Sequence, residues 1–114
     1  MVEDNQRDRP VITSTEFQAS VIHIVEEGIE RFGHLQASRY LDAIEQSVVR
    51  LKTNYPYYPE CRHLATQSRM YRNIIMDSHL IIYRITHERI EVLDIVHSAS
   101  SMNRIKRVRN IHIE

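Results

Sequence analysis

Hydrophobic residues in the first half of the chain recur at three- and four-residue steps, the spacing that places them on one face of a helix. One such stripe predicts a helix over residues 15–32, and a second predicts a helix over residues 34–53. Gly33 lies between them, where it is suited to end the first helix in left-handed geometry. A connection this short predicts an antiparallel helical hairpin whose apolar side still needs cover.

The segment ahead of the hairpin divides into two parts. Residues 1–10 are polar, offer little to bury and end in a proline, which predicts a flexible leader. The sequence "VIT" at residues 11–13 is a candidate short strand. Thr13 stands three residues before Glu16, which is the spacing of a capping box, so Thr13 is expected to cap the first helix.

The second half of the chain has the pattern of strands. Pro56 and Pro59 cannot continue the second helix, and from Met70 onward come the apolar runs "MYRNIIM", "HLIIYRI" and "IEVLDIV". The links between these runs, residues 77–78 and 86–89, have lengths that suit hairpins. Three strands in an antiparallel meander are therefore expected.

Strict alternation along the last run assigns its side chains to two faces of the sheet. One face would carry Ile90, Val92, Asp94 and Val96, and the other Glu91, Leu93 and Ile95. The expected fold is an α+β domain over residues 11–101, with an N-terminal short strand and an antiparallel helical hairpin packed on a C-terminal antiparallel β-meander. Residues 102–114 form a basic C-terminal tail, for which the pattern allows a short helix or an added edge strand.

Composition and charge narrow the classes of function. The 114 residues suit one domain, and 15 basic residues balance 15 acidic ones. Because the overall charge is zero, any contact with nucleic acid must be local. The polar start and the shortness of the apolar runs predict a cytoplasmic protein with no contact to a membrane.

Metal and redox chemistry find little support in the sequence. Cys61 is the only cysteine, so no intramolecular disulfide can form and the paired cysteines of zinc motifs are absent. The histidines other than His97 are scattered and form no ligand pattern with an obvious supporting carboxylate. No metal and no cofactor are expected.

The order of elements, ending in "VLDIVHSAS", resembles the RelE/ParE superfamily of bacterial type II toxins over residues 11–101. The local matches are "NYPYYPECRHL" after the second helix, Arg72 in "YRNI", the strand "LIIYRI" and the strand "VLDIVH". The resemblance implies the toxin of a type II toxin-antitoxin system of the plasmid-stabilisation type. It also implies a cognate antitoxin as partner, with a disordered segment that folds against the toxin.

One branch, the RelE-like toxins, cleaves mRNA on the ribosome. Cleavage needs a base, an acid and cations that stabilise the charged transition state. Leu80 and Ser98 stand where this branch has an arginine and a tyrosine, so two catalytic groups are missing. The candidates that remain for an endoribonuclease are His97, Arg72, Glu60, Arg62 and Arg69.

The other branch, the ParE-like toxins, binds DNA gyrase and performs no known reaction of its own. The strand "EVLDIVH" and the pair Tyr83 and Arg84 resemble this branch better, although Asp94 stands where it often has arginine. Inhibition of DNA gyrase is therefore the expected function, and a ribonuclease is the alternative. The residues expected to bind partners are Tyr83, Arg84, Arg104, Lys106, Arg107 and Arg109.

Two questions stay open at the level of sequence. His97 is either an acid or base in catalysis or a strand-end residue that packs locally, and the missing basic groups leave room for an inactive toxin-like binding module. The basic tail between Arg104 and Arg109 suits either nucleic acid or an acidic antitoxin segment.

Overall fold

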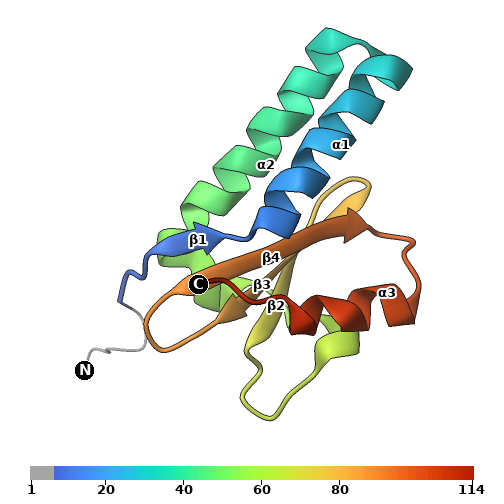
Figure 1. The fold of residues 1–114 in the computed structure, drawn as a ribbon. Coiled ribbons are helices and arrows are strands. Elements are labelled where there is room, and N and C mark those ends of the chain that lie inside the picture. Colours follow the sequence, from blue (N-terminus) through green and yellow to red (C-terminus); the bar gives the residue numbers. More distant parts are fainter. Residues whose placement is uncertain (1–6) are drawn as a thin grey trace.

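Two long helices, α1 (Thr15–Phe32) and α2 (His34–Asn54), form the expected hairpin in the computed structural model, which describes residues 7–114 (Figure 1). Gly33 joins them with φ 90°, the region that favours glycine, and its N–H donates to the carbonyl of Ile29. The hairpin extends well beyond the sheet at its tip (Figure 1). Its inner face therefore meets the sheet only toward its base.

The expected helix cap is wrong by one residue. Ser14 caps α1, because its Oγ accepts a hydrogen bond from the N–H of Phe17 at 2.8 Å. Ser14 is buried and its hydroxyl also donates to the carbonyl of Leu93. Thr13 is instead the last residue of a strand and pairs with Val92, which keeps it outside the helix.

A four-stranded sheet packs against the hairpin. Its strands are β1 (Val11–Thr13), β2 (Tyr71–Ile75), β3 (His79–Ile85) and β4 (Ile90–His97), arranged in the order β1-β4-β3-β2. The last three form the expected antiparallel meander, and β1 adds to its edge parallel to β4. The α+β fold expected from the sequence is confirmed.

The strict alternation expected along β4 is wrong, because the strand contains a bulge. Tyr83 pairs with Val92 and Ile82 pairs with Asp94, so Leu93 is an extra residue opposite β3. Past the bulge, Ile95 belongs to the core cluster beneath the hairpin, and Val96 belongs to the cluster on the other face of the sheet. From Ile90 to Val96 every residue is buried, since both faces of the sheet are covered.

The C-terminal segment covers the second face of the sheet. It begins with a short helix, α3 (Met102–Lys106), continues as a 3-10 turn (Arg107–Asn110) and runs on to residue 114 without regular structure. Ile105 and Val108 are buried in the core cluster of this face. Of the two alternatives left by the sequence, the segment is thus a helix.

The structure describes only the last four residues of the expected leader, residues 7–10. Residues 1–6 lie outside the described residues. Arg9 is packed against the domain: its backbone N–H donates to the carbonyl of Lys52 at 3.1 Å, and its Nη1 to the carbonyl of Thr86 at 2.5 Å. Its guanidinium also lies over the ring of Tyr55. Residues 7–10 therefore take part in the packed structure.

Candidate functional site

His97 ends β4 and stands directly opposite His79 on β3. The two imidazole rings are 5.5 Å apart, edge to face. The backbone N–H of Ala99 donates to Nδ1 of His97 at 3.0 Å, so a neutral His97 carries its proton on Nε2. His97 is exposed and His79 half-buried, which leaves one imidazole of the pair open to solvent.

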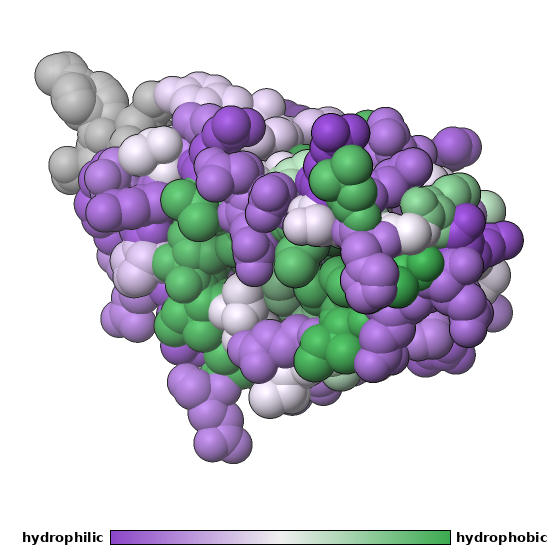
Figure 2. Space-filling view, turned by 90° about the horizontal axis from the view of Figure 1, so that it is seen from above, coloured by the Kyte–Doolittle hydropathy of each residue, from purple (hydrophilic) through white to green (hydrophobic). Residues whose placement is uncertain are grey.

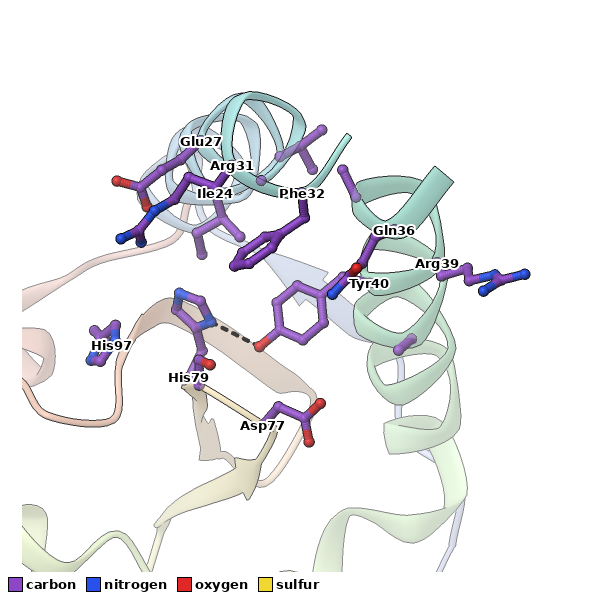
Figure 3. Close-up of a pocket in the computed structure, with 15 residues that line it drawn as sticks. Ile24, Glu27, Arg31, Phe32, Gln36, Arg39, Tyr40, Asp77, His79 and His97 are labelled. Carbon is purple, nitrogen blue, oxygen red and sulfur yellow. Dashed lines mark hydrogen bonds between the residues drawn. The ribbon is translucent and has the colours of Figure 1, made fainter. Parts of the chain in front are cut away.

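Tyr40 of α2 completes this cluster from the other layer. Its hydroxyl lies 2.8 Å from Nδ1 of His79, as the dashed line in Figure 3 shows. The cluster borders a cavity of about 450 Å³ between the hairpin and the end of the sheet. Phe32 and Ile24 point into this cavity from α1, whereas the charged end of Arg39 points away (Figure 3).

Sequence reasoning missed Tyr40 and His79. Tyr40 was part of the apolar stripe of the second helix, and His79 was one of the scattered histidines. His79 meets His97 only through the register of β3 and β4. That register includes the bulge at Leu93, which the sequence pattern does not predict.

Burial favours the uncharged forms of His79 and Tyr40. Burial, helped by the nearby His97, lowers the pKa of His79, and Glu27 opposes the shift only in part. Burial also raises the pKa of Tyr40, so its hydroxyl stays protonated at neutral pH. The contact between hairpin and sheet at this point is therefore neutral under physiological conditions.

We expect this contact to weaken in mild acid. Because the pKa of His79 is lower in the folded than in the unfolded chain, the unfolded chain binds more protons once the pH falls below about 6.5. The contribution of His79 to stability is complete above that pH and is lost as the pH falls toward the folded pKa. Urea unfolding across this range should show the loss, and His79→Gln should flatten it. His23→Gln, on the exposed side of α1, is the matched control and should follow the wild type.

The ribonuclease candidates do not converge on one place. Arg72 pairs across β2 and β3 with Tyr83, which pairs in turn with Val92 of β4. His97 lies five residues farther along β4, a separation of roughly 16 Å at about 3.3 Å per residue. Arg72 and His97 therefore cannot act on the same phosphate.

The remaining candidates lie at the end of the sheet occupied by Arg72. Glu60 forms an isolated bridge with Arg72, and its carboxylate accepts from the N–H of Thr66 and pairs with Arg69 at 3.6 Å. Arg62 is exposed in the 3-10 turn Arg62–Leu64. This group contains no histidine paired with a carboxylate, and its carboxylate is engaged in local hydrogen bonds.

Two of the expected partner-binding residues are part of the framework. Tyr83 is fully buried, and its hydroxyl donates to the carbonyl of Tyr55 at 2.7 Å. Burial raises the pKa of Tyr83 far above its ordinary value. Arg84 pairs with the buried Glu91 at 2.6 Å and is itself mostly covered. A partner that docks on the folded surface does not reach the side chain of Tyr83.

Asp94 binds one basic residue of the C-terminal tail, Arg104. Its carboxylate accepts from Oγ of Ser20 on α1 at 2.7 Å and from Arg104 on α3 at 3.0 Å. Arg104 is thus the ion-pair partner of the buried Asp94. Asp94 itself stands at the position where the resemblance leads one to expect an arginine. Lys106, Arg107 and Arg109 are exposed.

Large apolar side chains are exposed mainly on the hairpin. Among the described residues, four of the seven lie there, Ile22 and Phe32 on α1 and Leu35 and Val49 on α2, each at least 60% exposed. The other three are Tyr57, Ile75 and Met102. Figure 2, which looks down on the hairpin side, shows apolar patches there, separated by polar side chains. Such patches on a small domain are typical of surfaces that bind another protein.

Comparison with known proteins settles the family. The family model described as ParE toxin of type II toxin-antitoxin system, parDE, matches residues 11–102. The chain belongs to the ParE toxin family. The match spans β1, the hairpin and the meander, which confirms both the superfamily and the branch indicated by the sequence. It stops at the first residue of α3, so most of the C-terminal segment lies outside the matched residues.

A solved structure agrees with the ParE fold. A chain described as "Chromosomal ParDE TA system from P. aeruginosa" superposes with a TM-score of 0.65, covering 78% of this chain and 95% of the other at 13% identity. No curated protein matches the sequence significantly. None of the helices within residues 7–114 combines the length and hydrophobicity that a membrane span requires. Nor do three potential metal ligands come together among these residues.

Proposed function

We propose that this chain is the toxin of a type II toxin-antitoxin pair, that it acts by inhibiting DNA gyrase and that a cognate antitoxin holds it inactive. The ParE family match over residues 11–102 is the observation that carries the proposal. The layout of the nuclease candidates supports it, since Arg72 and His97 lie too far apart to serve one reaction centre.

Antitoxin binding draws support from the surface of the hairpin. Phe32 and Leu35, both more than 60% exposed, flank the turn at Gly33, and Ile22 and Val49 extend the apolar surface along the helices. A disordered segment that folds against this surface would bury these side chains and gain roughly 1.5–3 kcal/mol for each one fully covered. The exposed apolar surface would then exist only in the free toxin.

The function is tested with the purified chain in two parallel assays. We expect inhibition of gyrase-catalysed supercoiling together with accumulation of cleaved DNA, and no cleavage of mRNA on translating ribosomes. The variant His97→Gln should inhibit gyrase as the wild type does, because His97 is a solvent-exposed strand end. Cleavage of mRNA that His97→Gln abolishes would favour the ribonuclease alternative, and inactivity in both assays would indicate a toxin-like binding module.

A further inference from the structure

The neutral overall charge conceals an uneven distribution. Residues 15–54, which form the hairpin, carry six acidic and four basic residues. Residues 98–114 carry four basic residues and a single acidic one. The hairpin is therefore net acidic and the C-terminal segment net basic, so a local positive field exists on the C-terminal segment although the whole chain is neutral.

The packing of the C-terminal segment turns its cations outward. Ile105 and Val108 are buried against the sheet, which leaves Lys106, Arg107 and Arg109 exposed on the other side. The 3-10 turn Arg62–Leu64 packs beside α3, as Figure 1 shows, and adds the exposed Arg62. We call Arg62, Lys106, Arg107 and Arg109 the C-terminal basic face.

These cations are not used to hold the fold together. Within residues 7–114, none of the four members of the basic face forms an ion pair. Arg104, Arg84 and Arg89 in the same half of the chain each pair with a buried acid. The chain thus separates arginines that build the structure from a group that is available to an outside anion.

We propose that the C-terminal basic face binds the phosphate backbone of double-stranded DNA. Three of its four members are arginines, whose planar guanidinium groups match phosphate oxygens with paired hydrogen bonds. Residues 98–114 contain no Phe, Tyr or Trp on which the bases of a single strand could stack. A duplex, which is recognised through its phosphates, fits this surface better than a single strand.

The hydropathy of the two ends favours DNA over an acidic protein. Protein interfaces need an apolar core, and the exposed apolar side chains lie chiefly on the hairpin. Within residues 98–114, which carry three of the four members of the basic face, Met102 is the one large apolar side chain that is exposed. We therefore assign the antitoxin to the hairpin and double-stranded DNA to the C-terminal basic face.

The test measures binding of the whole chain to a fluorescent DNA duplex by anisotropy, in a salt titration and with gyrase absent. Three or four phosphate contacts predict a slope of about −3 for log K against log salt. The triple variant Lys106→Gln, Arg107→Gln, Arg109→Gln should bind at least about tenfold more weakly at low salt and show a slope nearer zero. Its substitutions lie on exposed side chains, and circular dichroism checks the fold.

The matched control is the variant Arg31→Gln, Arg39→Gln, Arg50→Gln, which removes the same charge from exposed positions of the hairpin. It should bind DNA as the wild type does. The proposal is overturned if the wild type fails to bind duplex DNA at low salt, if both variants lose affinity equally, or if polyglutamate binds more tightly than DNA. Because gyrase takes no part, these outcomes are independent of the supercoiling assay.

Discussion

Replacing Glu91 by alanine should lower the free energy of unfolding by about 3 kcal/mol, because it leaves two largely buried arginines without their anion. The Glu91 carboxylate is 8% exposed and pairs with Arg84 at 2.6 Å and with Arg89 at 2.7 Å. Burial alone would raise the pKa of Glu91, but the hydrogen bonds from both arginines outweigh burial and lower it. The carboxylate is therefore charged at every pH at which the protein is expected to work.

The same substitution should release the end of the chain. Arg84 donates to the carbonyl of Ile111 at 3.1 Å, and Arg89 donates to the carbonyl of Ile113 at 2.6 Å. Glu91 orients both guanidinium groups, so without it these contacts lose their fixed geometry. Faster exchange of the Ile111 amide, which donates to the carbonyl of Val108 at 3.1 Å, should accompany the lower stability.

Urea unfolding measures the effect of Glu91→Ala. Glu88→Ala is the control, because Glu88 is exposed in the turn between β3 and β4 and its side chain forms no hydrogen bond or ion pair within residues 7–114. The control should stay within about 0.5 kcal/mol of the wild type. Equal stabilities for Glu91→Ala and Glu88→Ala would show that the two arginines do not depend on Glu91.

Periodicity predicted the elements, because the hairpin and the sheet each bury one continuous apolar face. The stripes gave both helices to within a residue or two, and alternation gave the three strands of the meander. Thr13 and Ser14 show the limit of local signals: both residues suit a helix cap, and pairing of Thr13 with β4 decides between them.

Burial on both faces explains why β4 was harder to predict. A strand covered on two sides is apolar throughout, so its sequence does not reveal the extra residue at Leu93. The bulge in turn decides which side chains of β4 face the hairpin. The secondary structure of the C-terminal segment was open for a related reason. The segment is held by packing of its buried side chains against Ile82 and Leu93 of the sheet, which a local sequence pattern does not show.

The site was predicted less well than the fold. Tyr83 and Arg84 stand out in the sequence, but the structure places one in the core and the other in a buried ion pair. An apolar strand does not distinguish residues that bind a partner from those that bind the rest of the chain. Burial and ion pairing, which require the fold, make that distinction for the basic residues of the C-terminal segment.

Replacing Arg72 by alanine should lower the free energy of unfolding by about 3 kcal/mol, although Arg72 looks like a catalytic residue in the sequence. Its guanidinium donates to the backbone carbonyls of Arg69 at 2.7 Å, Pro56 at 3.0 Å and Tyr58 at 2.9 Å. These hydrogen bonds hold the connection between α2 and β2 against the sheet. The substitution leaves three carbonyl groups without their charged donor and frees that connection.

Arg62→Ala separates this structural role from a catalytic one. Arg62 was a nuclease candidate beside Arg72, but its side chain is exposed, so its removal should change stability by no more than about 0.5 kcal/mol. Toxicity that falls with Arg72→Ala should fall in proportion to the amount of folded protein, and Arg62→Ala should keep the wild-type amount of folded protein. If Arg72→Ala is as stable as the wild type yet inactive, Arg72 contacts the target directly and its hydrogen bonds to the connection are dispensable.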